Sequence, residues 1–121
     1  FITLEDLTEV RFWQEAADAV RNLAPTLTGN AFRTAVGREL LSRQVTDLLD
    51  ATARRLADGK VRSLADVRAA ATPLVGPSDR VAGMKRELEQ FLRERVYRHH
   101  RVLRMTANGK RVLKALFAEY V

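Results

Sequence analysis

Apolar residues recur every three or four positions along most of the chain, which is the spacing of a helix that buries one face. No stretch alternates apolar and polar residues for long with β-branched side chains, so the sequence predicts no strand. The pattern predicts an all-α fold: a single helical domain of about five helices, one of them long, with short capped connections.

The first helix is predicted to begin at Thr3, because Thr3 and Asp6 have the spacing of a capping box. Pro25 and Gly29 are predicted to break the helical pattern. Its apolar face is predicted to consist of Leu4, Leu7, Val10, Trp13, Ala17, Val20 and Leu23.

The second helix is predicted to run from an N-cap at Asn30 to about Asp58, with Gly59 as its stop signal. At 1.5 Å per residue it would be about 42 Å long. Its apolar positions are Phe32, Val36, Leu40, Leu41, Val45, Leu48, Leu49, Thr52 and Leu56. This stripe is wider than the two-position seam of a coiled coil, so we expect the helix to pack on more than one neighbour.

Two serines mark the starts of the next helices. Ser63 and Asp66 form a second capping-box pattern, which predicts a short helix through about Ala71. Residues 73–77 contain two prolines and a glycine and predict a loop, after which Ser78 caps a fourth helix. The apolar side of that helix is predicted to consist of Val81, Met84, Leu88, Phe91, Leu92 and Val96.

The pattern changes between Tyr97 and His100, and we expect a bend or break there, before Arg101. A final helix is predicted to start near Thr106 or Asn108. The apolar residues that it is expected to pack are Val112, Leu113, Leu116, Phe117 and Tyr120.

The composition fits one globular domain over residues 1–121, with 46% hydrophobic and 30% charged residues. The absence of cysteine excludes thiol nucleophiles, iron–sulfur clusters and disulfides, and it favours a reducing compartment, so we expect a cytoplasmic location. No apolar run approaches the roughly 20 residues that span a bilayer, so no membrane partner is predicted. The chain opens at Phe1 without an initiator methionine, and we expect it to be a piece of a longer protein.

The net charge of +6 is concentrated in one segment. Between Asp79 and Lys114 there are eleven basic and four acidic residues, a local charge of +7, while the rest of the chain sums to −1. The densest part, residues 91–105, reads FLRERVYRHHRVLRM and mixes bases with a tyrosine and two histidines. Basic charge of this kind attracts phosphates, whether in nucleotides or in nucleic acid.

A bend near His99 would gather some of these guanidinium groups, which suit phosphate oxygens through bidentate hydrogen bonds. The candidate nucleotide- or phosphate-binding residues are therefore Arg95, Tyr97, Arg98, His99 and Arg101. The alternative, left open, is a solvated face on which arginine stems cover apolar surface.

The sequence offers no catalytic or metal-ligating set. Its two histidines, His99 and His100, are adjacent and would point about 100° apart on a helix, so they do not suit a shared metal. The motifs H-E-x-x-H, G-x-S-x-G, G-x-x-x-x-G-K and G-x-G-x-x-G do not occur. We therefore predict neither catalytic residues nor a metal site in this chain.

Two stretches resemble a known family. The stretch from Met84 reads MKRELEQFLRERVYRHHRVLRM and is followed by KRVLKALFAEY. Together they resemble the C-terminal signature of bacterial HD-domain deoxyguanosinetriphosphate triphosphohydrolase-like proteins. The matching residues are Phe91, Leu92, Val96, Tyr97 and His99 in the first stretch and Val112, Leu116, Phe117 and Tyr120 in the second. ITLEDLTEVRFW and VTDLLDATARRL are also similar to earlier parts of the same domain. His100 is a departure, because members often have proline there.

The resemblance implies a helical accessory domain, associated with phosphohydrolases, of a larger enzyme. That parent would hydrolyse a deoxynucleoside triphosphate to the deoxynucleoside and triphosphate, at a divalent metal held by its HD domain. The HD domain is absent from this chain, so the chain is expected to be non-catalytic and to hold no cofactor. The implied partners are the HD domain of the same parent chain, further copies in a homo-oligomer and a nucleotide effector.

A basic helical module that binds nucleic acid or another protein is the alternative. Against nucleic acid, the predicted second helix is too long for either helix of a helix-turn-helix, and the aromatic platform for stacking on bases is thin at Tyr97. A protein-interaction module without a ligand stays open, because sequence barely separates it from an accessory domain.

Overall fold

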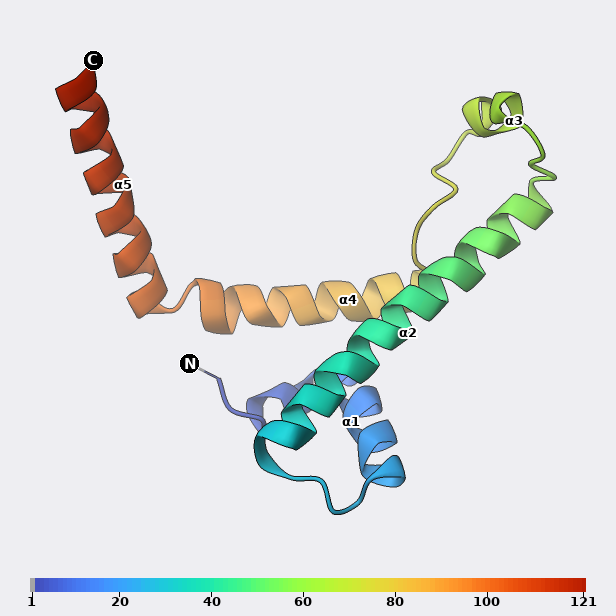
Figure 1. Ribbon diagram of the computed structural model, residues 1–121, viewed down its shortest axis with the longest axis horizontal. Coiled ribbons are helices and arrows are strands. Elements are labelled where there is room, and N and C mark those ends of the chain that lie inside the picture. The colour runs from blue at the N-terminus through green and yellow to red at the C-terminus, as the bar shows by residue number, and fades with distance from the viewer. Residues whose placement is uncertain (1) are drawn as a thin grey trace.

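The computed structural model describes residues 2–121, which are mostly helical and contain no strand. In chain order the elements are the 3-10 turn η1 (Asp6–Glu9), α1 (Arg11–Leu23), α2 (Gly29–Asp58), α3 (Leu64–Ala69), α4 (Asp79–Leu92), the π-helical turn η2 (Arg93–Tyr97) and α5 (His100–Tyr120). The predicted all-α fold with five helices, one of them long, is confirmed. Figure 1 shows α1, α2 and α4 crossing near one another, while α3 and α5 extend away from this crossing.

The core lies where α1 packs against α2 and α4. Helix α1 contributes more of it than any other element, because its apolar residues recur at helical spacing on one face. The buried cluster consists of Val10, Phe12, Trp13, Ala16, Ala17, Val20, Phe32, Val36, Val81 and Met84. Ala16 and Ala17 of α1 are almost fully buried, and their small side chains let the neighbouring helices approach closely.

The first helix begins later than predicted. Thr3 and Asp6 do bond each other as a capping box would: the Thr3 amide donates to Asp6 Oδ2 (2.7 Å) and the Asp6 amide donates to Thr3 Oγ1 (3.2 Å). They close the short turn η1, however, and Val10 then adopts an extended conformation (φ −99°, ψ 114°) before α1 starts at Arg11. The Val10 side chain is buried in the core, as the apolar pattern predicted. The extended backbone of Val10 was not predicted, because the apolar pattern continues through it at helical spacing.

Helix α2 starts at Gly29, so the predicted N-cap at Asn30 is wrong. Thr28 occupies the N-cap position with extended backbone, and Gly29 follows with φ +60°, a conformation that glycine tolerates because it has no Cβ. The predicted end at Asp58, with Gly59 as the residue after it, is confirmed.

Between Leu41 and Leu56, helix α2 has a stripe of exposed apolar side chains. Its large side chains are 63% (Leu41), 48% (Val45), 64% (Leu49) and 36% (Leu56) exposed. The predicted additional neighbour for this stripe is therefore not found among residues 2–121.

The connection from α2 to α4 contains α3 and returns to α2. The Ser63–Asp66 capping box is confirmed, but α3 ends at Ala69 instead of about Ala71. The Arg55 guanidinium donates to the carbonyl oxygens of Gly76 and Pro77, at 2.6 Å each.

Asp47 holds the start of α4 against the same helix. The Asp47 carboxylate accepts the Ser78 amide (2.8 Å) and the Ser78 hydroxyl (2.6 Å), while Ser78 Oγ also caps α4 by accepting the Val81 amide (3.3 Å). The predicted Ser78 cap is confirmed, and α2 therefore fixes where α4 begins.

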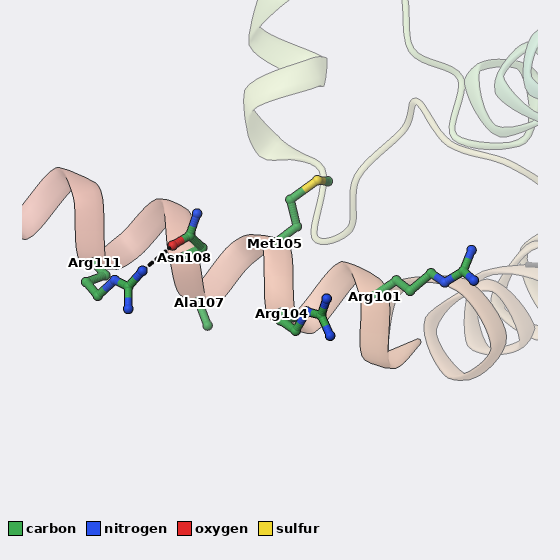
Figure 2. Close-up of a pocket in the computed structure, with 6 residues that line it drawn as sticks. All are labelled: Arg101, Arg104, Met105, Ala107, Asn108 and Arg111. Carbon is green, nitrogen blue, oxygen red and sulfur yellow. Dashed lines mark hydrogen bonds between the residues drawn. The ribbon is translucent and has the colours of Figure 1, made fainter.

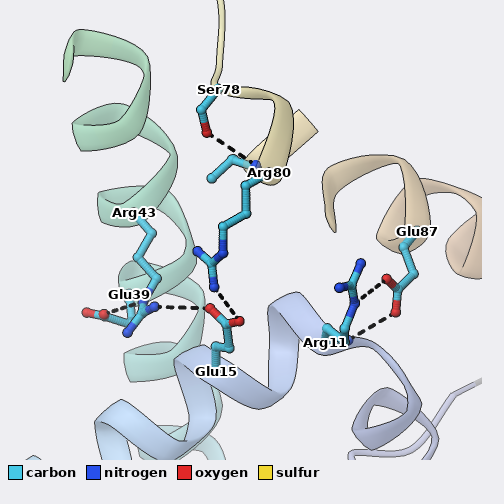
Figure 3. A network of polar contacts seen from close by, with 8 residues as sticks. Arg11, Glu15, Glu39, Arg43, Ser78, Arg80 and Glu87 are labelled. Atoms are coloured by element: carbon cyan, nitrogen blue, oxygen red, sulfur yellow. Dashed lines mark hydrogen bonds and ion pairs between the residues drawn. The ribbon is translucent and has the colours of Figure 1, made fainter. Parts of the chain in front are cut away.

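Ion pairs surround the core and join its three helices (Figure 3). Glu15 on α1 contacts Arg80 of α4 (2.7 Å) and Arg43 of α2 (3.6 Å). The Arg11 amide and guanidinium both donate to Glu87, and these hydrogen bonds lower the pKa of Glu87 below its ordinary value. Because the pairs are partly solvated, each adds little stability and mainly orients the helices.

Helix α5 starts at His100, so the prediction of a start near Thr106 or Asn108 is wrong, although the expected break before Arg101 is confirmed. The break lies at Arg98 and His99, and His99 has extended backbone (φ −61°, ψ 136°). His99 caps α5, because its Nδ1 accepts the Arg101 amide at 3.3 Å.

Desolvation, followed by the neighbouring charge of His100, lowers the pKa of His99 below its ordinary value of 6.5. A lowered pKa favours the neutral ring, which is the form that can accept a hydrogen bond at Nδ1.

The apolar residues of α5 do not pack on the domain as predicted. None of its residues is buried, and beyond its junction with η2 the helix makes at most marginal contact with other elements. Val112, Leu113 and Leu116 are about half exposed and Phe117 is 68% exposed, so their covering surface is not among residues 2–121.

Replacing Phe12 by alanine is expected to lower the free energy of unfolding by about 3 to 5 kcal/mol, because Phe12 is 1% exposed and its removal leaves a cavity. Chemical denaturation followed by circular dichroism measures the change. Leu23→Ala is the control: Leu23 is 84% exposed, and its replacement is expected to change stability by less than about 0.5 kcal/mol. Equal effects at the two positions would contradict the position of the core.

Acidification is expected to loosen the first turn of α5. A group whose pKa is lowered by folding contributes stability that is present above its ordinary pKa, here 6.5, and is lost as the pH falls through the lower folded value. Hydrogen exchange of the Arg101 amide, followed by NMR after correction for intrinsic exchange, should therefore lose protection below this range. His99→Asn keeps a capping acceptor without a titrating ring, so its protection should not change with pH. The same pH dependence in both proteins would exclude His99 as its cause.

Candidate phosphate-binding site

The five residues that the sequence selected lie around the break between η2 and α5. The π-helical turn η2 continues directly from α4, and its chain direction changes at Arg98 and His99. The Arg98 amide donates to the Arg93 carbonyl (3.0 Å), and the His99 amide donates to the Val96 carbonyl (3.1 Å). The main chain at the break is therefore held by its own hydrogen bonds.

Arg95 points back toward the N-terminal part of the chain. Its Nη2 lies 3.8 Å from Glu9 Oε2, and its guanidinium carbon lies 6.0 Å from the centre of the Phe91 ring. The Tyr97 side chain is 63% exposed, and Arg98 is also exposed. Within residues 2–121, no hydrogen bond or ion pair joins the Tyr97 or Arg98 side chain to Arg95.

The two histidines contact each other instead of a shared ligand. Their ring centres are 4.3 Å apart and the ring planes are inclined by 34°. His99 Nδ1 already accepts the Arg101 amide. Within residues 2–121, no three His, Cys, Asp or Glu side chains lie close enough together to hold a metal ion.

A shallow hollow follows one side of α5 (Figure 2). The residues that line it are Arg101, Arg104, Met105, Ala107, Asn108 and Arg111. The arginines are three and seven residues apart, so all three come to the same side of the helix. Arg111 donates to Asn108 Oδ1 (2.8 Å), and no acidic side chain lines the hollow.

The structure thus brings one of the five selected residues, Arg101, together with two arginines that were not selected, Arg104 and Arg111. Their helical spacing was visible in the sequence. The predicted start of the final helix near Thr106 or Asn108 concealed this spacing, because that start places Arg104 outside the helix.

Within residues 2–121, no helix combines the length and the apolar character needed to cross a bilayer.

Part of the chain matches a protein-family model. Residues 75–121 match the phosphohydrolase-associated domain, which includes α4, η2 and α5. The break, the basic hollow and the exposed apolar face of α5 therefore all lie in the matched region. No solved structure matches the chain.

Curated relatives match almost the whole chain. A protein of Thiobacillus denitrificans is 35% identical over 119 residues, covering 98% of this chain and 31% of the relative. A protein of Parvibaculum lavamentivorans is 38% identical over 116 residues, covering 95% of this chain and 29% of the relative. A protein of Geobacter sulfurreducens is 34% identical over 121 residues, covering 100% of this chain and 31% of the relative.

All three relatives are named deoxyguanosinetriphosphate triphosphohydrolase-like protein. The chain spans about a third of their length. The chain is therefore similar, along its whole length, to one segment of the deoxyguanosinetriphosphate triphosphohydrolase-like proteins, and its residues 75–121 match the phosphohydrolase-associated domain.

Proposed function

We propose that this chain is the helical accessory segment of a deoxynucleoside triphosphate triphosphohydrolase and is not itself catalytic. The main support for the proposal is that the whole chain is similar to a segment making up about a third of the length of proteins with that name. The phosphohydrolase-associated domain over residues 75–121 points to the same role. The absence of cysteine agrees with a cytoplasmic location for such an enzyme.

The reaction proposed for the whole protein is attack of water on a deoxynucleoside triphosphate, which releases the deoxynucleoside and triphosphate. A divalent metal would supply Lewis-acid chemistry for this step. Residues 2–121 do not fit such a metal, because His99 and His100 are adjacent with tilted rings in contact, and no group of three ligand side chains is found there. We therefore assign the metal and the reacting groups to an HD domain outside this chain.

The role left to this chain is to support that domain and to join copies of the protein. The exposed apolar side chains of α2 and α5 support this assignment, because a patch of this kind is normally covered by another protein surface. Leu49 of α2 and Phe117 of α5 are 64% and 68% exposed. We propose that the HD domain of the same parent chain and further copies of this protein cover these surfaces.

A phosphate-binding role is proposed for the basic side of α5. Arg104 and Arg111 line one hollow with Arg101 at its edge, and no acid competes for their guanidinium groups in its lining. Guanidinium groups match the oxygens of a triphosphate, which is the group shared by a substrate and a nucleotide effector. Arg95, Tyr97, Arg98 and His99 stay a wider prediction for the same site.

The accessory role is tested by grafting this chain into the Thiobacillus denitrificans relative in place of the matching 31% of its length. We expect the relative without that segment to lose deoxyguanosine triphosphate hydrolysis and the graft to restore it, because the chain supplies packing that the catalytic part needs. The activities of the truncated relative and of the graft are both measured as the rate of triphosphate release. A graft carrying Phe12→Ala is the matched control and should fail, because the core that shapes the segment is lost.

The isolated chain should release no triphosphate with magnesium, manganese or cobalt present. Metal-dependent release by the purified chain would overturn the non-catalytic assignment. Full activity of the relative without its segment would overturn the supporting role.

The phosphate-binding role is tested with inorganic triphosphate as the probe, by titration calorimetry on this chain. Arg104→Ala and Arg111→Ala are each expected to weaken binding about tenfold, the loss of about 1.5 kcal/mol that one charge-assisted contact provides. Binding should also weaken as salt is raised.

Arg33→Ala and Arg54→Ala, outside the basic segment, are the controls and should bind triphosphate like the unaltered chain. Large losses at Arg95 and Arg98 with none at Arg104 and Arg111 would move the site to the break. Small and equal effects on triphosphate binding at all six arginines would show that the basic residues form a solvated face without a phosphate site. The six positions are Arg33, Arg54, Arg95, Arg98, Arg104 and Arg111.

A further inference from the structure

Helix α5 has two different sides. Arg104, Arg111 and Lys114 lie along one side, and a stripe of apolar residues lies on the other. The stripe consists of Val102, Met105, Val112, Leu113, Leu116 and Tyr120. Met105 is 74% exposed and Tyr120 86% exposed, and Figure 1 shows α5 extending away from the other helices. A helix with one long exposed apolar side needs a partner surface of similar length.

We propose that the apolar side of α5 packs on α5 of a second copy of this chain, in an antiparallel pair centred on Gly109. The inference rests on the self-association in the proposed function and deepens it by naming the surface, the orientation and the register. It does not depend on the reaction of the parent enzyme.

The position of Gly109 sets the centre of the pair. Gly109 lies on the apolar side, and a Cβ built there would meet nothing within 4 Å, so the space above it is open. Val102 and Leu116 lie seven residues before and after it. A two-fold axis through Gly109 therefore puts Val102 of one copy opposite Leu116 of the other. Without a side chain at the crossing, the two backbones can approach closely there.

The charges on α5 select the antiparallel orientation. Glu119 is the only acidic residue of α5 and lies 18 residues after Arg101. At about 3.6 residues per turn this is about five whole turns, so both residues lie on the same flank of the apolar stripe. In the antiparallel pair Glu119 of each copy lies about two residues along the axis from Arg101 of the other, which forms two equivalent ion pairs.

A parallel pair loses this complementarity, because Arg101 and Glu119 of different copies would be about 27 Å apart along the axis. On the other flank the two Lys110 side chains meet near the antiparallel crossing, where their long stems let the ammonium groups separate in solvent. Arg104 and Arg111 face away from the pair and stay accessible, whereas Arg101 and Met105, which also line the basic hollow, lie at the pair.

Disulfide crosslinking tests the orientation, and the chain is suited to it because it contains no cysteine. Val102→Cys and Leu116→Cys chains are prepared separately and then mixed under mild oxidation. We expect crosslinked dimers in the mixture and few in either variant alone, because two Val102 positions lie about 21 Å apart in the antiparallel pair. Crosslinking of each variant with itself would instead show a parallel pair and overturn the proposal.

A charge exchange tests the register by analytical ultracentrifugation. Arg101→Glu and Glu119→Arg should each weaken dimerisation about tenfold, because two attractive pairs become repulsive. The chain with both substitutions should dimerise like the unaltered chain. Arg104→Glu, on the opposite side of α5, is the matched control and should not weaken dimerisation. Failure of the double substitution to restore the dimer would overturn the register.

Leu116→Asp separates this proposal from self-association in general. It should abolish dimerisation while circular dichroism keeps its helical signal, whereas Leu49→Asp on the exposed stripe of α2 should leave the dimer intact. If only Leu49→Asp abolishes association, the copies meet through α2 and the α5 pair is overturned, while self-association stands. If the unaltered chain is monomeric at high micromolar concentration, both are overturned, and the role tested by the graft is unaffected.

Discussion

The burial of one face of α1 is the constraint on which the rest of the arrangement depends. Phe12 and Ala16 are almost completely buried between α2 and α4, and the cluster around them is the core of the described chain. Burial of an aromatic side chain contributes about 1.5 to 3 kcal/mol, more than any of the solvated ion pairs at its edge. Glu15 and Arg11 therefore orient helices that the apolar contact holds together. Elements that do not touch α1, namely α3 and α5, extend from this centre.

The parts of the fold that could be predicted from sequence are those set by local chemistry. A serine with an acid three residues later places the start of α3, and Ser78 places the start of α4, because their hydroxyl groups satisfy free amides of the first turn. The start of α2 was misplaced, because Gly29 enters the helix through a positive φ angle that composition does not reveal. Val10 was predicted to be helical because it fits the apolar spacing. Its backbone is extended, but its side chain is still buried in the core, so the spacing alone does not reveal the difference.

The candidate site was only partly predictable for a related reason. The concentration of basic charge was plain from the sequence, and so was the break in the chain, but the restart of α5 at His100 depends on a histidine acting as the cap. Histidine is not a usual cap, so Arg104 was separated from Arg111 and the shared side of the helix was missed. The apolar pattern of α5 predicted a packed face, but its residues are exposed within residues 2–121, because periodicity does not say which molecule covers a face. The chain spans about a third of the length of its relatives, and the partners proposed for its exposed surfaces lie outside it.

The attachment of residues 74–78 to α2 has a consequence for how this segment can change over time. Arg55 and Asp47 fasten the end of the connection to the helix it left, so α3 sits in a side excursion that is closed at its base. Each doubling of the length of a flexible loop costs only about 0.6 kcal/mol in closure entropy. Insertions, deletions or a replacement of α3 should therefore leave the direction of α4 intact as long as the two anchoring side chains remain. This excursion is the natural place for related proteins to differ in length, and for a tag or a reporter domain to be inserted without disturbing the core.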